Sequence, residues 1–380
     1  MFDIVIVGAG ICGAVLAERF AQDSNKKVLL IERRQNIGGN CYDEIDENGI
    51  LIHKYGPHLF HTDDAEIFNY LSKFTAWQTY QHKVLAMIDG QPVPLPFNFN
   101  TLYKVFPQNL AERLEVALLQ NFEYGKKIPI LELKNSPSAD LQFLADFVYE
   151  KIFLHYTEKQ WNLTPDKIDG AVTARVPVSI SRDDRYFSDK FQAVPKFGYT
   201  AMFQKILAHK NIKLMLNTAF NEIASLRDGK IFLFDTEFDG KIIYTGQLDE
   251  LFNFKFGALP YRSVDMKFET VDAENFQAAA TVNYPNNYNF TRITEFKKIH
   301  PAKSARTTIL KEIPQNYIVG ENVPYYPIFT DAAKEAHAKY FDELKNFPQI
   351  KAVGRLAEYK YFDIDDAVKR AFEVYAELKN

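Results

Sequence analysis

Three glycines near the start of the chain have the spacing of a dinucleotide-binding turn. Gly8, Gly10 and Gly13 in VIVGAGICGAV directly follow an apolar run and precede an alanine-rich stretch. The first glycine permits a tight turn, the second lets the backbone approach a pyrophosphate, and the third permits close packing of helix on strand. Amides at the helix start would face the phosphates. The pattern predicts a dinucleotide site; a turn that only tightens packing is the alternative.

The segment after this turn indicates which dinucleotide is bound. Glu32 closes the second apolar run, 19 positions after the third glycine, where a carboxylate can accept hydrogen bonds from ribose hydroxyls. NAD and FAD both fit this unit. In IERRQNIGGNCYDE, Arg33 and the turn of Gly38, Gly39 and Asn40 follow at a spacing that resembles the flavin-containing amine oxidase superfamily. That resemblance implies FAD.

Outside this turn, the sequence shows no pattern typical of nucleophilic or metal-dependent catalysis. No Ser/His/Asp or Cys/His arrangement is recognisable. The two cysteines, Cys12 and Cys41, form neither a CxxC pair nor a zinc spacing, which suits a reducing compartment. We therefore predict no metal ion.

The composition indicates a folded protein with several lobes. A chain of 380 residues is longer than one hydrophobic core usually spans, and 47% of its residues are hydrophobic. The 32 Phe and 21 Tyr suggest a ligand cleft walled by rings and phenol hydroxyls. A net charge of -4 argues against general nucleic-acid binding. The start of the chain lacks a signal-peptide layout and no apolar run is long enough for a membrane span, so we expect a cytoplasmic protein.

The periodicity of apolar residues predicts the elements that position these residues. A βαβ unit is expected over residues 3–31, and helical spacing recurs at 63–74 and 109–161. A strand at 242–246 and an amphipathic helix near the C-terminus would complete the nucleotide-binding lobe. Short β-rich pieces divided by Pro, Asn and Gly predict an antiparallel sheet built from distant segments; they lie at 84–98, 175–181, 267–271, 278–284 and 288–296.

The predicted fold is therefore α/β, with a discontinuous Rossmann-like FAD-binding domain, an inserted helical lobe and an antiparallel sheet domain for substrate. The predicted FAD-binding domain comprises residues 1–75, 196–250 and 340–380. The predicted helical lobe comprises residues 101–171. The predicted sheet domain comprises residues 76–100, 172–195 and 251–339.

Segments spread along the whole chain, and in the same order, resemble the bacterial type of UDP-galactopyranose mutase. This ordered set is far more specific than any single motif. The segments are HKYGPHLFHT (53–62), LPFNFNT (95–101), YTEKQW (156–161), RVPV (175–178), YFSDKFQAVPKFGYT (186–200), IIYTG (242–246), FGALPYRS (256–263), FTRITE (290–295), PYYP (324–327) and GRLAEYKYFD (354–363).

The resemblance implies roles for particular residues. Candidate catalytic residues are Arg175, Arg292 and His61, the arginines neutralising a diphosphate and the histidine facing flavin and sugar. Candidate substrate-binding residues are Phe153, Tyr156, Trp161, Tyr186, Phe187, Asn283, Tyr325 and Tyr359, of which Tyr156 and Trp161 flank the uridine and Tyr186, Tyr325 and Tyr359 reach the diphosphate. Candidate cofactor residues are Gly8, Gly10, Cys12, Gly13, Glu32, Arg33, Gly39, Asn40, His58, Arg355 and Asp363.

The resemblance also implies the reaction, a contraction of the sugar ring of UDP-galactose or a related UDP-hexose. A covalent anchor at C1 keeps the sugar on the enzyme while its ring opens. In the family, N5 of reduced FAD displaces UDP from C1, the 4-hydroxyl closes on C1 and UDP returns. There is no net redox change, and the product supplies galactofuranose for cell-surface glycans. An electron donor, which the sequence does not identify, would keep the flavin reduced.

Some features leave alternatives open. His82 stands where the family often has asparagine, and Phe296 stands where it often has histidine, so UDP-N-acetylgalactosamine is an alternative substrate. Residues 166–178 resemble the family's mobile loop, although an immobile surface loop is the alternative. An FAD oxidoreductase of the amine-oxidase type and a non-catalytic flavin- or nucleotide-binding module are the rival functions. A homodimer is expected by analogy.

Overall fold

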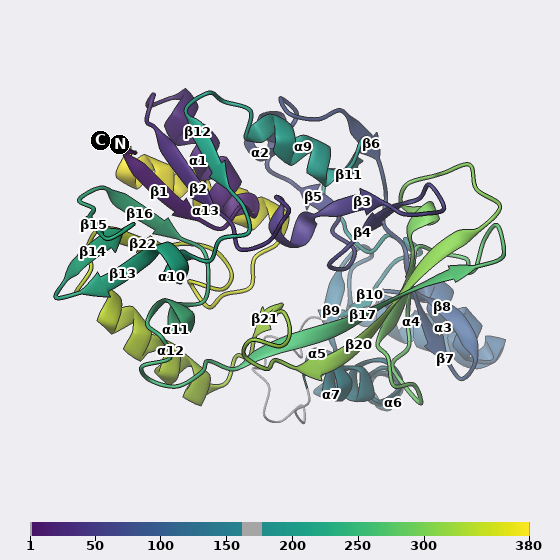
Figure 1. Cartoon of the computed structure of the whole chain (residues 1–380). Helices are drawn as coiled ribbons and strands as arrows, with labels where there is room; N and C mark the ends of the chain where they lie inside the picture. Colours follow the sequence, from purple (N-terminus) through teal and green to yellow (C-terminus); the bar gives the residue numbers. More distant parts are fainter. Residues whose placement is uncertain (1, 162–176, 380) are drawn as a thin grey trace.

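The computed structural model describes residues 2–161 and 177–379. Figure 1 shows two halves, with both chain ends in the half that contains β1 and α13. The long strands β17 and β20 run from the middle of the molecule into the other half (Figure 1). The α/β fold class is confirmed, with a Rossmann-like unit and separate sheets that include antiparallel ones.

Among the described residues, the Rossmann-like half is built on a five-stranded parallel sheet in the order β12-β2-β1-β16-β22. Its strands are β1 (Ile4–Val7), β2 (Val28–Ile31), β12 (Ile212–Met215), β16 (Lys241–Tyr244) and β22 (Ile350–Ala352). Helices α1 (Ile11–Gln22) and α13 (Ile364–Leu378) cover one face, and α12 (Asp331–Leu344) covers the other. The strands are continuous apolar runs because both faces of the sheet are buried.

Alternation along the strands divides this half into two cores. Side chains at successive positions of a strand point to opposite faces. Residues that pack with α1 and α13 include Ile4, Ile6, Val28 and Leu30. Residues that pack with α12 include Val5, Leu29, Ile31 and Ile242. The two sets hold the glycine turn, which follows β1, between rigid layers.

The other half contains a sheet that, over the described residues, has seven strands in the order β21-β17-β20-β19-β18-β7-β8. Its strands are β7 (Val84–Ile88), β8 (Gln91–Leu95), β17 (Tyr261–Val271), β18 (Thr281–Asn283), β19 (Arg292–Glu295), β20 (Thr307–Asn316) and β21 (Tyr326–Pro327). The sequence predicted an antiparallel sheet, but β18 pairs with β7 in parallel. These strands come from distant segments, so no hairpin turn fixes their direction.

The helical lobe packs on the β7–β8 end of this sheet around an apolar core. Its helices are α3 (Phe99–Val105), α4 (Gln108–Asn121), α5 (Ile130–Lys134), α6 (Ala139–Val148) and α7 (His155–Trp161). A π-helical turn, Tyr149–Leu154, leads into α7. The helical spacing predicted over 109–161 is interrupted by β9 (Lys127–Pro129), which pairs with β10 (Pro177–Ser179).

The remaining strands and helices of the described chain are shorter. The strands are β3 (Asp43–Ile45), β4 (Leu51–His53), β5 (Phe60–Thr62), β6 (Trp77–Thr79), β11 (Phe191–Pro195), β13 (Ala224–Arg227), β14 (Lys230–Leu233) and β15 (Thr236–Glu237). The helices are α2 (Ala65–Leu71), α9 (Tyr199–Ile206), α10 (Phe220–Ile223) and α11 (Leu248–Leu251). Within the described ranges, no helix is both long and apolar enough to cross a bilayer.

Candidate functional site

The glycine turn after β1 borders a cleft of about 600 Å³. Gly8 has φ +101°, and a Cβ on Gly13 would lie 1.9 Å from the carbonyl oxygen of Gly8, so neither position accepts a side chain. A Cβ on Gly10, by contrast, would meet only the Cα of Gly39, at 3.8 Å. The backbone at Gly10 is therefore open to the cleft, as close approach of a pyrophosphate requires.

Glu32 lies at the carboxyl end of β2 and lines the same cleft. Its carboxylate accepts hydrogen bonds from the amides of Ala9 (2.8 Å) and Arg34 (2.9 Å). The carboxylate thus fixes the glycine turn and the chain after β2 relative to each other. Each oxygen retains a lone pair, so hydrogen bonding to a ribose stays a prediction.

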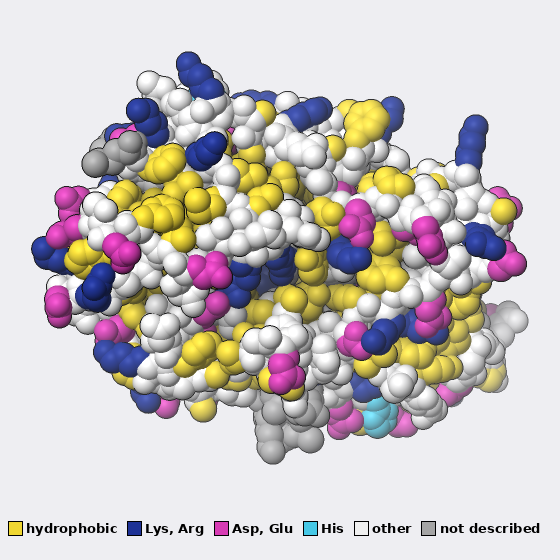
Figure 2. All heavy atoms as spheres, in the orientation of Figure 1, with side chains coloured by type: hydrophobic (Ala, Val, Ile, Leu, Met, Phe, Trp, Pro, Cys, Tyr) yellow, Lys and Arg dark blue, Asp and Glu magenta, His cyan; other side chains and the backbone are white. Residues whose placement is uncertain are grey.

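The cleft is lined by Arg33 and Arg34, which follow Glu32 in the sequence, and by Arg355. Arg33 forms an ion pair with Glu250. Arg34, which the sequence reasoning missed, lies 4.1 Å over the ring of Tyr55 and donates to Oδ1 of Asn40 at 3.2 and 3.1 Å. Figure 2 shows Lys and Arg side chains gathered in a hollow near the middle of this face of the molecule. Such a cleft suits an anionic dinucleotide.

The other predicted cofactor residues also surround this cleft. Cys12 contacts the carbonyl of Ala367 through Sγ at 3.4 Å, and burial raises the pKa of its thiol to about 12, so the thiol is unreactive. His58 bonds to the carbonyl of Gly56, and burial lowers its pKa to about 4. Asp363 is the N-cap of α13. With the open backbone at Gly10 and the arginines, these residues fit a flavin dinucleotide.

A second polar cluster lies where β19 meets α7. Arg292 Nη2 donates to the hydroxyl of Tyr156 at 2.7 Å, and Nε lies 3.5 Å from Oε2 of Glu312. Asn283 is the cross-strand neighbour of Arg292, so both side chains lie on one face of the sheet. Burial raises the pKa of Glu312. Glu312 was not among the residues that sequence reasoning selected.

Several atoms of this cluster have no hydrogen-bond partner among the described residues. They are Arg292 Nε, Glu312 Oε1 and Asn283 Oδ1. Buried polar atoms without partners are costly, and a bound ligand is one way in which they are satisfied. The guanidinium of Arg292 can therefore bind an anionic group, and the two oxygens can accept hydrogen bonds from N–H or O–H groups of the same ligand.

Aromatic rings form a wall beside this cluster. The ring of His61 stacks on Phe187 at 3.7 Å between centroids, and His82 stacks on Phe187 at 5.9 Å. Tyr186 meets His82 edge-on, and His61 Nδ1 lies 3.3 Å from Oδ1 of Asp189. Burial, together with nearby charge, lowers the pKa of His82 to about 3, so its ring is neutral.

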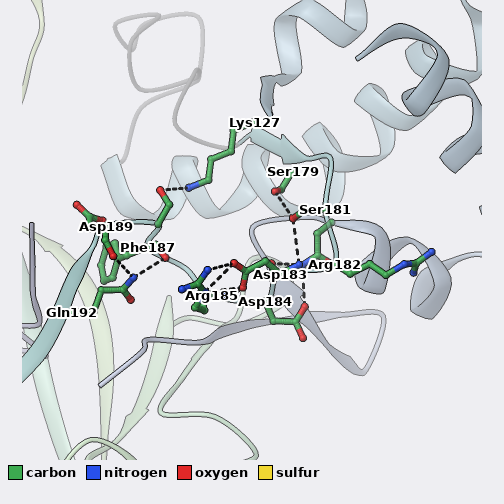
Figure 3. Close-up of polar contacts among 12 residues, drawn as sticks. Lys127, Ser179, Ser181, Arg182, Asp183, Asp184, Arg185, Phe187, Asp189 and Gln192 are labelled. Carbon is green, nitrogen blue, oxygen red and sulfur yellow. Dashed lines mark hydrogen bonds and ion pairs between the residues drawn. The ribbon is translucent and has the colours of Figure 1, made fainter. Parts of the chain in front are cut away.

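The segment that carries this wall is held by polar contacts that Figure 3 shows. Arg185 pairs with Asp183 just before the two aromatic residues. After them, Gln192 donates to the carbonyls of Phe187 (3.2 Å) and Asp189 (2.9 Å). Short-range contacts on both sides thus fix the direction of the Phe187 ring.

One predicted tyrosine, Tyr359, lies in a different place from the one expected, and a neighbouring tyrosine is more exposed. Tyr359 is 5% exposed, and its hydroxyl donates to the carbonyls of Pro260 (2.5 Å) and Ile328 (3.3 Å), so it lies in a core and its phenol is already engaged. Tyr361, two positions later, is 38% exposed and stacks on Tyr326. The sequence reasoning missed this pair.

Tyr326 and Tyr361 lie together against Arg355, which lines the cofactor cleft. The guanidinium of Arg355 lies over both rings, at 5.2 and 5.7 Å. It also donates to the carbonyls of Tyr325 (3.3 Å) and Phe362 (3.1 Å), which line the same cleft. Tyr325 lines the cleft, whereas Tyr326, the first residue of β21, is not part of its lining.

The remaining candidates are not brought into the cluster or are not described. Phe153 is 2% exposed in the core of the helical lobe, and Phe296 is fully buried against Phe268. Arg175 lies outside the described residues, as does most of the predicted mobile loop, and Trp161 ends α7 with a side chain that is not described. Within the described ranges, no group of His, Cys, Asp and Glu could hold a metal ion.

The chain is similar to known proteins in sequence and in fold. A family model described as UDP-galactopyranose mutase matches residues 151–361, and one for an NAD(P)-binding Rossmann-like domain matches residues 6–74. The chain is 33% identical to dTDP-fucopyranose mutase of Escherichia coli, covering 98% of this chain and 97% of the relative. It is 34% identical to UDP-galactopyranose mutase of Mycoplasma pneumoniae, covering 97% and 94%. Its fold is similar to that of a reduced UDP-galactopyranose mutase, with TM-score 0.73, 16% identity, and coverage of 100% and 94%.

Proposed function

The chain belongs to the UDP-galactopyranose mutase family, and from this premise we propose that it interconverts UDP-galactopyranose and UDP-galactofuranose on reduced FAD. The family makes the chain an isomerase and a flavoprotein. The observation that carries the specific proposal is the Arg292 cluster, in which a cation, a phenol and unsatisfied polar atoms lie together. Such a group suits the diphosphate of a nucleotide sugar.

The proposed reaction requires UDP to leave C1 and later to return. In its reduced form, FAD supplies a nucleophilic nitrogen, N5, for C1 without net oxidation. Arg292 is suited to stabilise the negative charge that develops on UDP as the bond to C1 breaks, because its guanidinium stays charged. Tyr156 adds a neutral hydroxyl at the same place. Arg175 is proposed as the second arginine, by resemblance.

The aromatic wall has a different proposed role. Phe187 with the rings of His61 and His82 presents a flat, mostly apolar surface that can orient a sugar and exclude water beside the flavin. His82 is neutral, so it can exchange a hydrogen bond with a sugar hydroxyl without competing for the diphosphate. We propose His61 as a positioning group and not as a general base.

One experiment tests which hexose and which nucleotide the substrate contains. UDP-galactose is the proposed substrate, UDP-N-acetylgalactosamine is one alternative, and a dTDP-6-deoxyhexose is another because a dTDP-fucopyranose mutase is among the similar proteins. His82 stacks on Phe187 at the site and stands where the family often has asparagine, so these alternative substrates are retained. Phe296 does not bear on them because its side chain lies in a core.

The test uses purified flavin-loaded protein reduced with dithionite. We expect it to convert UDP-galactofuranose to UDP-galactopyranose, followed by chromatography, with UDP-N-acetylgalactofuranosamine and dTDP-fucofuranose as parallel substrates. Preferred conversion of either of these would correct the substrate but retain the reaction. If a flavin-loaded, reduced protein converts none of the three, the reaction is wrong. Hydrogen peroxide or NAD(P)+ formed in proportion to product would favour an oxidoreductase of the amine-oxidase type.

Several broader proposals rest on the family resemblance. We propose a cytoplasmic homodimer that provides galactofuranose for cell-surface glycans and receives electrons from a separate donor. We also propose the division into an FAD-binding domain (1–75, 196–250 and 340–380), a helical lobe (101–171) and a substrate sheet domain (76–100, 172–195 and 251–339). Sedimentation of the flavin-loaded protein tests the dimer.

A further inference from the structure

Lys159 on α7 makes an unusual set of contacts. Its ammonium donates to the backbone carbonyls of Tyr284 (2.5 Å), Tyr288 (3.2 Å) and Phe290 (3.1 Å). All three belong to residues 284–291, the loop that connects β18 to β19 and that we name the β18–β19 loop. One side chain therefore holds three points of a loop that belongs to a different lobe.

The ammonium of Lys159 is stabilised by the dipoles of backbone carbonyl groups. No carboxylate lies within ion-pair distance of Lys159 in the part of the chain that the structure describes, whereas Lys151, eight residues earlier, pairs with Asp89 at 3.1 Å on the surface. Burial lowers the pKa of Lys159 to about 8. A half-buried cation without an anionic partner is disfavoured, so its three hydrogen bonds have to be well placed to retain it.

The loop that Lys159 holds joins two residues of the Arg292 cluster. Asn283 ends β18 immediately before the loop, and Arg292 begins β19 immediately after it. Tyr156, which accepts a hydrogen bond from Arg292, lies on the same helix as Lys159, three positions earlier. The position of the ammonium thus determines how both ends of the loop meet α7.

Two other contacts fix the loop and α7 separately. Asn286, in the loop, donates to the carbonyl of Lys151, in the π-helical turn before α7, at 2.8 Å. Arg262, which is 3% exposed on β17, donates to the carbonyl of Gln160 at 2.7 Å and so caps the C-terminal end of α7. Lys159 lies between these contacts.

We propose that Lys159 is a positioning residue that fixes the β18–β19 loop against α7 and thereby places Arg292, Asn283 and Tyr156 to bind the diphosphate of a nucleotide sugar. This inference rests on the proposed function for the identity of the ligand. Lys159 acts through these three residues and does not touch the substrate. Its geometry depends on three donors radiating from one nitrogen, which a planar guanidinium does not reproduce.

The test compares Lys159→Met and Lys159→Arg with Lys151→Met, a matched control at an exposed ion pair. UDP is titrated calorimetrically into each flavin-loaded protein, and KM and kcat are measured separately. We expect the UDP dissociation constant and KM of Lys159→Met to rise about tenfold, from the loss of hydrogen bonds to a charged donor, with kcat changed less than threefold. Lys159→Arg should recover only part of the affinity, and Lys151→Met should bind within twofold of wild type.

A pH profile separates positioning from a general loss of stability. UDP affinity of the wild type should fall as the pH rises through about 8, because the amine that forms has fewer donors than carbonyls to satisfy. In Lys159→Met the affinity should not change over this step. Other charged or titratable groups near Lys159 are Tyr284 and Tyr288 on the loop, Arg262 on β17, and the pair of His155 and Glu158 on α7. These groups are present in both proteins, so a difference between the two pH profiles of UDP affinity is caused by Lys159.

Equal UDP affinity of wild type and Lys159→Met would overturn the proposal, as would an equal loss in the Lys151 control. If Lys159→Met does not fold, either of two other results would overturn the proposal. One is a wild-type pH profile of UDP affinity without a step near pH 8. The other is full UDP affinity of Lys159→Arg. A wild type that binds UDP but converts none of the nucleotide sugars would contradict the proposed reaction and leave the UDP titrations as an independent test of Lys159.

Discussion

The cofactor cleft and the Arg292 cluster are built in opposite ways. At the cleft, the glycine turn is fixed by contacts to the backbone within one βαβ unit, as where Glu32 accepts amides from Ala9 and Arg34. In the cluster, side chains from different lobes meet, and Arg292 and Tyr156 are 136 positions apart. The cleft depends on glycines, which have no side chain, such as Gly10. The cluster depends on particular side chains, such as that of Arg292. Substitutions should therefore damage the two regions by different mechanisms.

The largest effect is expected from removing the cation of the cluster. Arg292→Ala should lower kcat/KM by roughly 2 to 5 kcal/mol of transition-state stabilisation, because it leaves the departing diphosphate and Glu312 without a partner. Flavin content should stay at the wild-type level. Arg306→Ala, which removes an exposed arginine paired with Asp272, serves as control and should act within twofold of wild type. Near-normal turnover of Arg292→Ala would show that the cluster is not the diphosphate site.

The next effect distinguishes two glycines in the same turn. Gly13→Ala should destabilise the protein by about 3 kcal/mol, because its Cβ would overlap the Gly8 carbonyl, and the protein should purify without flavin. Gly10→Ala should unfold within about 1 kcal/mol of wild type in urea but lose flavin, because its methyl group would enter the open cleft. Normal flavin content of Gly10→Ala would remove the argument that the cofactor approaches this backbone.

The smallest effect distinguishes two tyrosines that are two positions apart. Tyr359→Phe should lower the free energy of unfolding by about 1 kcal/mol, since it removes a buried hydrogen bond to Pro260, while turnover stays normal. Tyr361→Phe should lower kcat/KM a few-fold, because Tyr361 lies with Tyr326 against Arg355, which lines the cofactor cleft. The opposite result would return Tyr359 to the substrate site, where the sequence reasoning expected it.

The same contrast explains which parts of the structure could be predicted from the sequence. The Rossmann-like unit was predictable because Gly8 is required by its backbone conformation, Gly13 by its contact with the Gly8 carbonyl and Gly10 by the open backbone at the cleft, and the spacing records these local requirements directly. The amphipathic C-terminal helix and the strand near 242 were predictable from apolar periodicity. The interruption of the helical region by β9 was not, because a strand of three residues has no clear periodic signal.

Side-chain direction was the part that sequence reasoning could not supply. Tyr359 belongs to a segment that resembles the family, and Phe153 lies just before another, yet both point into cores. Motifs place a segment at a site, but alternation and packing decide which of its residues face the ligand. Glu312 was missed for a related reason, since it contacts the cluster from a position outside the family-like segments. Lys159 lies within one of these segments, but its ammonium contacts the β18–β19 loop and not the cluster itself. The parallel pairing of β18 with β7 likewise depends on contacts between distant segments.

The order of strands in the parallel sheet has a consequence for how the protein is made. Its central strand, β1, is translated long before β22 and α13, which begin at residues 350 and 364. The apolar residues of α1 that α13 covers, such as Cys12 and Val15, therefore lack this cover until α13 has been made. The cleft beside the glycine turn, which includes Ala367, is likewise complete only after α13 has been made. A nascent chain that stalls before α13 would therefore expose an apolar surface to chaperones and proteases.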